Sequence, residues 1–365
     1  MNPGFSRYAV AVLFAAAPAA VFAASPALDL PAKAGPQMFA ASGATGMVLV
    51  VVTPVSTSIS GFGQDAPRSR KAPGAYSLVR ISSTSKLLTA DVALKLAAQG
   101  KLRLDDPLQR HAPPGATVPV LPGARPITLQ DLATHTSGLP RQPDLAPGAP
   151  VRWQWLSNYR PTVAPGPDAR YSNVGFDLLA DALGQAGGKP YTALLREHTT
   201  APLNMHDTTA NPTAAQCARL LQGADGPVKC ANNSDGAGTG GMYSTPEDMG
   251  AWMAYMLGLN PDHKPDPRAL QMFAETASLK SAEGLDFGGP AHGLGLGWIH
   301  LAAHGSAPAI LQKTGASPGF ISYMSIAPGA QVGVFAVATR LDLPAMALMV
   351  KQVNALTVAL AQRKR

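Results

Sequence analysis

Strand-like segments lie near the two ends of this 365-residue chain, and their placement constrains the fold more than any other feature. The β-branched run 46–53 is predicted as a buried strand, and 57–62 as its hairpin partner. The middle of the chain reads mostly as helices and loops. We therefore expect one discontinuous α/β domain with an inserted helical domain, and an active site in the cleft between them. Further strand-like runs are 294–301, 309–315, 320–327 and 332–339.

The same pattern predicts the domain boundaries. Residues 24–80 and 245–365 are assigned to the sheet domain, and 81–244 to the mostly helical domain that begins with the helix 79–100. The first part of the sheet domain, 24–45, reads as a Pro/Ala-rich linker. The last segment, 344–365, is predicted as an amphipathic helix with an apolar stripe.

Residues 1–23 have the pattern of a secretory signal peptide. Arg7 precedes an apolar run, and Val21-Phe22-Ala23 provides a cleavage site. An uncleaved anchor is the open alternative, although the run is short for a membrane span and no later stretch is expected to reach that length. Export makes a disulfide between Cys217 and Cys230 plausible, worth about 3 kcal/mol.

Charge and metal-ligand spacing exclude two other classes of function. The net charge is +7, but the basic residues are scattered and form no stripe of the kind that nucleic-acid binding requires. A weak attraction to anionic surfaces remains open. Twelve residues separate the two cysteines and no histidine cluster lies near them, so no metal site is expected.

A serine and a lysine three residues apart open the predicted helix 79–100. Ser82 and Ser83 lie where an N-cap is expected, and Gly100 lies where a glycine would end the helix. Residues three apart in a helical turn share a face, so Lys86 is expected beside the Ser83 hydroxyl. A buried lysine near the positive end of a helix has a lowered pKa and can activate a serine without histidine. An ordinary helix start with a solvated lysine is the alternative.

Two further clusters can complete this chemistry. Tyr171-Ser172-Asn173 offers a phenol and an amide at the start of a predicted helix. A phenol between two ammonium groups would have its pKa lowered from about 10. Lys313-Thr314-Gly315 offers a cation and a hydroxyl for a substrate carboxylate, and a glycine that lets a ligand approach the backbone. Taken singly, each cluster is equally well a helix start or a strand end.

The motifs S-x-x-K, Y-x-N and K-T-G, in this order, resemble those of the penicillin-recognising serine enzymes. The details resemble the branch of class C β-lactamases and low-molecular-mass penicillin-binding proteins, and within it the AmpH-type D-alanyl-D-alanine carboxypeptidase/endopeptidases. Position 82 is often glycine in this branch and is serine here. The resemblance runs from about residue 40 to the final helix. It rests on stretches such as VRISSTSKLLT, ITLQDLATHTSGLPR, YSNVGFDLLADAL and LQKTGASPGFISYM, and the pair QCARL…KCANN has its counterpart there.

The resemblance implies a fold and a role for each motif residue. The fold is a β-lactamase/DD-peptidase-like antiparallel sheet flanked by N- and C-terminal helices, with the inserted helical domain. Ser83 is then the acylated nucleophile, and no metal or organic cofactor is needed. The other implied roles are proton transfer by Lys86 and Tyr171, substrate amide binding by Asn173, carboxylate binding by Lys313 and Thr314 beside Gly315, and an oxyanion hole from the backbone N–H groups of Ser83 and Ala316.

Several competing signals receive other interpretations. The segment 315–319 spells G-x-S-x-G, but two predicted strands flank it, so Ser317 is interpreted as a turn residue. His135 is interpreted as a buried structural histidine. Arg340 either assists Lys313 or is an uninvolved surface arginine. The histidines without metal-like spacing are His292, His300 and His304.

The sequence therefore predicts a periplasmic serine DD-peptidase with peptidoglycan stem peptides as substrates. It would remove the terminal D-alanine, would also cut D-alanyl–diaminopimelate crosslinks, and would be acylated by β-lactam antibiotics at Ser83, with weak β-lactamase activity at most. A class C-type β-lactamase is the first alternative. A secreted esterase on the same fold is the second. Lys313 argues against it, because an ester substrate without a carboxylate would give this cation nothing to bind. A catalytically silent binding protein is the third. Association with the inner membrane, and whether Lys86 or Tyr171 is the base, are left open.

Overall fold

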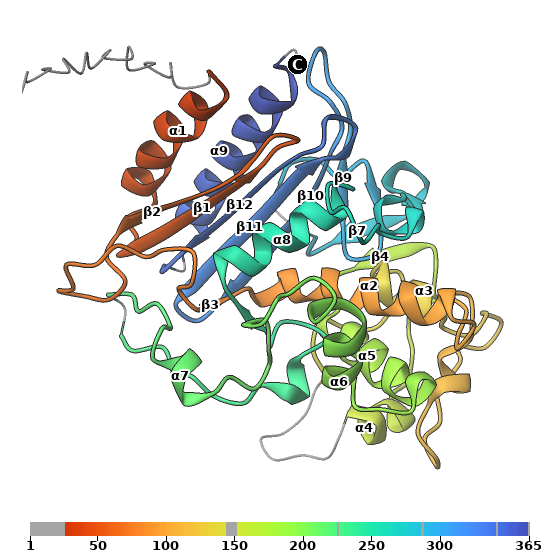
Figure 1. Ribbon diagram of the computed structural model, residues 1–365. Helices are drawn as coiled ribbons and strands as arrows, with labels where there is room; N and C mark the ends of the chain where they lie inside the picture. The colour runs from red at the N-terminus through yellow and green to blue at the C-terminus, as the bar shows by residue number, and fades with distance from the viewer. Residues whose placement is uncertain (1–25, 144–151, 225, 286–287, 341, 364–365) are drawn as a thin grey trace, which may run out of the picture.

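A computed structural model describes residues 26–143, 152–224, 226–285, 288–340 and 342–363, so the predicted signal peptide lies outside the described residues. Figure 1 shows a large sheet beside a group of helices. The helices are α1 (Pro26–Ser42), α2 (Ser85–Ala98), α3 (Leu129–Ala133), α4 (Arg152–Asn158), α5 (Asn173–Gly187), α6 (Tyr191–Leu195), α7 (Ala214–Cys217), α8 (Pro246–Met256) and α9 (Leu343–Ala361). The strands are β1 (Gly46–Val52), β2 (Thr57–Gly63), β3 (Val79–Arg80), β4 (Asp168–Arg170), β5 (Tyr243–Ser244), β6 (Ala274–Glu275), β7 (Ser281–Glu283), β8 (Gly293–Leu294), β9 (Ile299–Leu301), β10 (Ile310–Ser317), β11 (Phe320–Ala327) and β12 (Val332–Ala338).

The main sheet joins strands from both ends of the chain. Its order is β2-β1-β12-β11-β10-β9-β8-β6, and every neighbouring pair is antiparallel. β1 pairs with β12, with Leu49 opposite Ala336, although nearly 300 residues separate the two strands. The predicted antiparallel sheet built from both chain ends is therefore confirmed.

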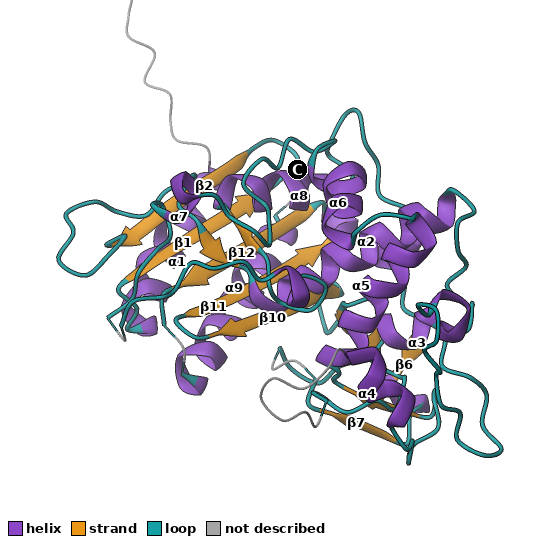
Figure 2. Ribbon diagram, turned by 90° about the horizontal axis from the view of Figure 1, so that it is seen from below, coloured by secondary structure: helices purple, strands orange, loops and turns teal. Residues whose placement is uncertain are grey.

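Both faces of the sheet are covered, which explains why β1 and β12 are apolar throughout rather than alternating. Val48 and Val50 point toward the larger core cluster, which contains residues of α2, α5 and α8. Met47 and Leu49 point to the opposite face, where α1 and α9 pack. Each fully buried Val or Leu side chain contributes about 1.5–3 kcal/mol. Figure 2 shows the long strands β1, β2, β11 and β12 on one side and α2 to α5 on the other, with the short strands β6 and β7 beside α3 and α4.

Two predictions about local structure are wrong. The predicted linker 24–45 contains the 17-residue helix α1, whose contacts with α9 and the sheet outweigh the cost of Pro31 and Pro36 inside it. The predicted single strand 294–301 is a hairpin of β8 and β9. Gly297, with a φ of +77°, makes the turn between them, a conformation that glycine adopts without steric cost.

Helix α9 corrects a third expectation. Its 19 residues are long and apolar enough to cross a membrane by length and composition, whereas no later stretch was expected to be. One side of α9, including Met346, Met349 and Val353, packs against the sheet. This packing accounts for its apolar composition, since a core helix passes the same test.

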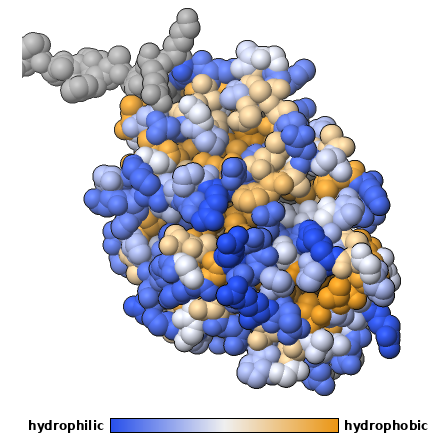
Figure 3. Space-filling view, turned by 90° about the vertical axis from the view of Figure 1, so that its right-hand side faces the viewer, coloured by the Kyte–Doolittle hydropathy of each residue, from blue (hydrophilic) through white to orange (hydrophobic). Residues whose placement is uncertain are grey.

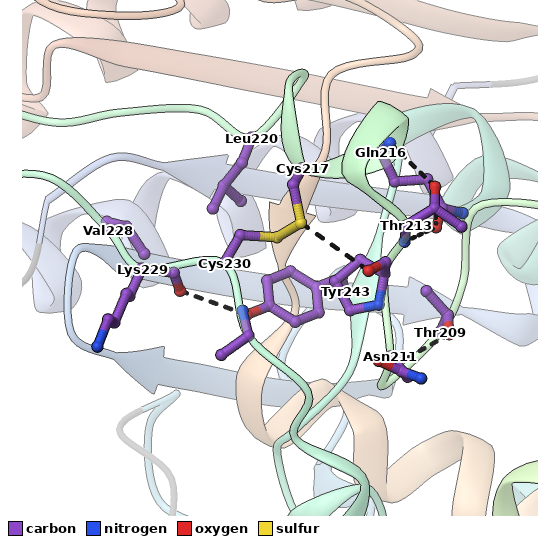
Figure 4. The surroundings of a disulfide bond; sticks show 12 residues. Thr209, Asn211, Thr213, Gln216, Cys217, Leu220, Val228, Lys229, Cys230 and Tyr243 are labelled. Carbon is purple, nitrogen blue, oxygen red and sulfur yellow. Dashed lines mark hydrogen bonds between the residues drawn. A yellow bond between two sulfur atoms is a disulfide. The ribbon is translucent and has the colours of Figure 1, made fainter.

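The disulfide between Cys217 and Cys230 is present in the structure, as predicted. Figure 4 shows that it lies beside Tyr243 of β5. The Tyr243 hydroxyl accepts hydrogen bonds from the Ala231 backbone N–H at 3.1 Å and from Asn233 Nδ2 at 3.1 Å. The disulfide and this tyrosine thus fix the segment that leads to Gly236–Gly241, which borders the site described below.

The helical part of the chain packs around α2 and α5. Both helices contribute buried Leu, Val and Ala side chains to one core. Gly100 lies just after the end of α2 with a φ of +70° and donates its N–H to the Ala97 carbonyl, so the predicted helix end is confirmed. The division of the chain at residues 80 and 245 stays a prediction.

The face of the molecule in Figure 3 mixes hydrophilic residues with smaller hydrophobic areas, as is usual for a protein surface.

Candidate active site

Ser83 lies in a short 3₁₀ turn, Ser82–Thr84, that leads from β3 into α2. It is partly exposed, while its neighbours Ser82 and Thr84 are buried. The N-cap of α2 is Thr84, whose side chain makes no capping hydrogen bond. The expectation that Ser82 or Ser83 caps the helix is therefore wrong, and the Ser83 hydroxyl is directed to other partners.

The hydroxyl of Ser83 contacts both residues expected to transfer its proton. Tyr171 Oη donates a hydrogen bond to Ser83 Oγ at 2.7 Å, and Lys86 Nζ lies 3.3 Å from the same atom. The serine and the lysine are brought together by one helical turn. The tyrosine arrives from the start of α5, 88 residues further along the chain.

Lys86 is 0 % exposed and is held by neutral oxygens. Its Nζ donates to Asn173 Oδ1 at 2.9 Å and lies 2.7 Å from both the carbonyl and the hydroxyl oxygen of Thr239. Burial lowers the pKa of Lys86 more than Tyr171 raises it, and the neighbouring Lys313 cation adds a smaller lowering effect. Such an environment favours the neutral amine, the form that can accept a proton.

Thr239 is the site residue that the sequence analysis missed. It lies in the glycine-rich segment Gly236–Gly241, which carries none of the three motifs. Its hydroxyl also donates to Asn173 Oδ1 at 3.1 Å. The only signal in the sequence is a single threonine among glycines, which names no partner.

His135 supports Tyr171 from behind. The two rings stack with centroids 4.5 Å apart, and His135 Nδ1 accepts the backbone N–H of Ser172 at 3.1 Å. Burial lowers the pKa of His135 well below its usual value, and the nearby cations Lys86, Lys313 and Arg141 lower it further. The ring is therefore neutral and buried, which agrees with the structural role predicted for it.

The start of α5 is fixed by two hydrogen bonds. Ser172 is the N-cap, and its Oγ accepts the N–H of Gly175 at 2.9 Å. The Arg141 carbonyl accepts the N–H of Asn173 at 2.8 Å. These bonds direct Asn173, the first helical residue, toward Lys86, so the Y-x-N spacing places both the amide and the phenol close to the lysine amino group.

Lys313 and its neighbours form the wall supplied by β10. Lys313 is 1 % exposed, and its Nζ lies 5.2 Å from the centre of the Tyr171 ring. Lys86 Nζ lies 4.9 Å from the same centre, so the amino groups of both lysines lie close to the phenol ring. Thr314 is buried and Ala316 is exposed.

Gly315 lets two segments of the chain approach closely. A Cβ at this position would lie 2.5 Å from the Ile81 carbonyl oxygen and 2.3 Å from Ser322 Oγ. The missing side chain therefore lets β10 approach the segment before Ser83, and the predicted approach of a ligand at this glycine stays a prediction. Position 315 is one of several in the described part of the chain where the close approach of another backbone segment requires glycine.

Two competing residues make no hydrogen bond with the Ser83 hydroxyl, whose partners among the described residues are Lys86 and Tyr171. Ser317 ends β10 in a hairpin with β11, not in a strand-to-helix turn, so its interpretation as a turn residue is confirmed. Arg340 is exposed, donates to the Gly43 carbonyl at 2.9 Å and forms an ion pair with Asp342. It is thus a surface arginine at the junction of α1 with β12.

The comparisons with known proteins agree with this geometry. The family model described as Beta-lactamase matches residues 33–359. The D-alanyl-D-alanine-carboxypeptidase/endopeptidase AmpH of Escherichia coli K12 is 42 % identical over 349 residues, which cover 93 % of this chain and 90 % of the relative. The crystal structure of a beta-lactamase/D-alanine carboxypeptidase from Yersinia pestis, complexed with citrate, has a TM-score of 0.87 and 42 % identity, and the match covers 92 % of this chain and 99 % of that one.

A more distant structure supports the fold alone. The class C beta lactamase of Rhodobacter sphaeroides matches with a TM-score of 0.71 at 20 % identity, over 89 % of this chain and 98 % of its own. The family match spans both ends of the sheet and the helices between them. This chain belongs to the beta-lactamase family of serine hydrolases.

Proposed function

We propose that the chain is a periplasmic serine D-alanyl-D-alanine carboxypeptidase that also cleaves D-alanyl–diaminopimelate crosslinks in peptidoglycan. The observation that carries the proposal is the Ser83 hydroxyl held between Tyr171 Oη and Lys86 Nζ. The relative that shares 42 % identity over nearly the whole chain is a carboxypeptidase/endopeptidase by name, which supports the substrate class.

The first step is acylation of Ser83. Lys86 and Tyr171 act as the pair that takes the Ser83 proton, and the oxygen attacks the carbonyl carbon of the penultimate D-alanine. The backbone N–H groups of Ser83 and Ala316 bind the oxyanion, each contributing about 3 kcal/mol to the transition state. The same pair returns the proton to the leaving amine.

The remaining residues hold the two sides of the scissile bond. Lys313 and Thr314 bind the carboxylate of the leaving residue, which both D-alanine and the D-centre of diaminopimelate carry. Asn173 Oδ1 accepts from Lys86 and Thr239, so the amide nitrogen is the part that meets a substrate carbonyl. Water then attacks the acyl carbon, Ser83 regains its proton, and the shortened peptide leaves.

A class C-type β-lactamase is the second candidate. The favouring observation is that the acylation apparatus needed for a β-lactam is the same set of residues, Ser83, Lys86, Tyr171 and Lys313. The two functions differ in how fast water hydrolyses the acyl-enzyme. We propose that β-lactams acylate Ser83 and are released slowly.

The deciding experiment uses mature protein and its Ser83→Ala variant on defined muropeptides. Each is incubated with a pentapeptide monomer and a D-alanyl–diaminopimelate crosslinked dimer, and the products are analysed by mass spectrometry. We expect loss of D-alanine and splitting of the dimer with the parent protein alone.

A matched assay with a chromogenic cephalosporin separates the candidates. Rapid, sustained hydrolysis of the cephalosporin, with both muropeptides left intact, would show that the chain is a β-lactamase and not a peptidase. Turnover of a short-chain ester alone would indicate the esterase. If Ser83→Ala matched the parent in every assay, the chain would be a binding protein without catalysis.

A further inference from the structure

Ser82, the residue before the nucleophile, has an unfavourable backbone conformation. Its φ is +49°, in the left-handed region that glycine adopts freely and that costs other residues about 1 kcal/mol or more. It is also 1 % exposed. A buried serine in this conformation requires a compensating interaction.

The compensating interaction is a hydrogen bond across to the end of β10. Ser82 Oγ donates to Ser317 Oγ at 2.8 Å. Two further bonds hold the same segment: Ser322 Oγ donates to the Ile81 carbonyl at 2.9 Å, and Ser85 Oγ donates to the Ser82 carbonyl at 2.6 Å. The turn before Ser83 is thus tied on one side to the sheet and on the other to α2.

Ser82 and Ser317 each lie next to a residue whose backbone N–H is proposed to bind the oxyanion. Ser82 immediately precedes Ser83, and Ser317 immediately follows Ala316. The bond therefore joins the two backbone segments whose N–H groups are proposed to bind the oxyanion. Gly315 lets these segments approach closely, since any side chain there would meet Ile81.

We propose that Ser82 and Ser317 are positioning residues whose hydrogen bond sets the separation of the two oxyanion-hole donors. This inference rests on the proposed acylation of Ser83. Oxyanion stabilisation depends on donors placed in advance at the distance the developing charge requires. A clamp between the two segments holds that distance without either serine touching the substrate.

The test is a double-mutant cycle with acylation of Ser83 as the readout. Ser82→Ala, Ser317→Ala and the double variant are purified as full mature chains. The rate of labelling by a fluorescent penicillin and the rate of D-alanine release from pentapeptide are measured side by side. We expect each single variant to slow the chemical step about tenfold with KM nearly unchanged, and the double variant to be no slower than either single one.

Ser82→Gly separates positioning from stability. Glycine removes the hydroxyl but also the backbone strain, so this variant should unfold at a higher temperature than Ser82→Ala and still acylate slowly. Ser317→Thr keeps the hydroxyl and should keep most of the rate. Ser325→Ala is the matched control, because Ser325 is a buried serine of β11 whose hydroxyl has no hydrogen-bond partner within the described residues.

Specific outcomes would overturn the proposal. Ser82→Gly acylating as fast as the parent would show that the hydroxyl only offsets strain, and additive effects in the cycle would show that the two serines act independently. If penicillin labels the parent protein while the pentapeptide stays intact, the peptidase assignment fails, and penicillin labelling in the mutant cycle still tests the role of the Ser82–Ser317 hydrogen bond. A parent protein that shows neither reaction would overturn both the peptidase assignment and the proposed positioning role.

Discussion

Helix α2 carries two buried charged side chains five residues apart, and their surroundings are opposite. Asp91 is 2 % exposed; it pairs with Lys95 at 2.8 Å and accepts hydrogen bonds from Thr199 Oγ1 at 2.8 Å and Tyr255 Oη at 3.0 Å. Lys86 is as deeply buried, but within the described part of the chain it forms no ion pair with a carboxylate. Its partners are neutral oxygens.

The difference shows how one helix serves both stability and chemistry. Removing one partner of a buried, hydrogen-bonded ion pair leaves an uncompensated charge, so such a pair is costly to disturb. A buried cation without a counterion, and with Lys313 nearby, gives up its proton more easily, because burial lowers its pKa. The lysine that is expected to transfer a proton is therefore the buried group that lacks a carboxylate partner.

Replacing Lys86 by Met should have the largest effect on rate. We expect acylation of Ser83 to fall about 10³-fold, as for loss of a general base. The melting temperature should be no lower than that of the parent, since the variant no longer buries a cation. Stopped-flow labelling and thermal unfolding measure the two. Lys95→Met, the same change on the same helix, should leave the rate within a few fold, and an equal loss of rate there would contradict the comparison.

Replacing Asp91 by Ala should affect stability instead. Removing this carboxylate leaves Lys95, Thr199 and Tyr255 without their shared acceptor, which should cost about 3 kcal/mol of unfolding free energy. Urea unfolding measures the loss, and the acylation rate of the folded fraction should change little. A stable but slow Asp91→Ala protein would show that the Asp91 site also serves the chemistry.

Asp177, one turn after Asn173, tests how far a carboxyl group influences Lys86. Burial raises the pKa of Asp177 to about 7, against the opposing effect of the Arg152 cation. Because the folded state holds this proton more tightly than the unfolded state, the contribution to stability declines as the pH rises from about 4 to about 7. Such a shift corresponds to at most about 4 kcal/mol, and the partial exposure of the residue reduces it to about 2 kcal/mol.

Asp177→Asn should therefore be about 2 kcal/mol more stable than the parent at pH 8 and equal to it near pH 4. Urea unfolding at several pH values measures the difference. The carboxylate also raises the pKa of Lys86, so the rate of the variant should rise at lower pH than that of the parent. A stability difference independent of pH would exclude titration of Asp177 as its cause.

Thr239→Val should have the smallest effect. It removes the hydroxyl that contacts Lys86 and Asn173 but keeps the backbone carbonyl that accepts from Lys86. Loss of the two hydrogen bonds of this hydroxyl, together a net effect of about 1 kcal/mol, should slow acylation about fivefold to tenfold. Thr239→Ser should restore the rate. If both variants act like the parent, the carbonyl alone orients the lysine.

Much of the fold was predictable because its pattern is local. The run 46–53 and the runs of the last hundred residues predicted the sheet, since β-branched residues between turn signals favour strands. The helix α1 in the predicted linker was missed, because its formation depends on packing against α9 rather than on the propensity of a segment with two internal prolines. The turn at Gly297 was missed because a short apolar run resembles one strand.

The sequence by itself determined the pairs that lie close along the chain: Ser83 with Lys86 by one helical turn, and Tyr171 with Asn173 at a helix start. Only the tertiary structure decided which groups from distant segments meet these pairs. Thr239 neutralises no charge and carries no motif, yet it contacts Lys86 because a glycine-rich segment passes there. The role of Gly315 likewise depends on Ile81, more than 230 residues away. Short-range geometry follows from backbone hydrogen bonding, whereas burial, pKa and close approach depend on how the whole chain packs.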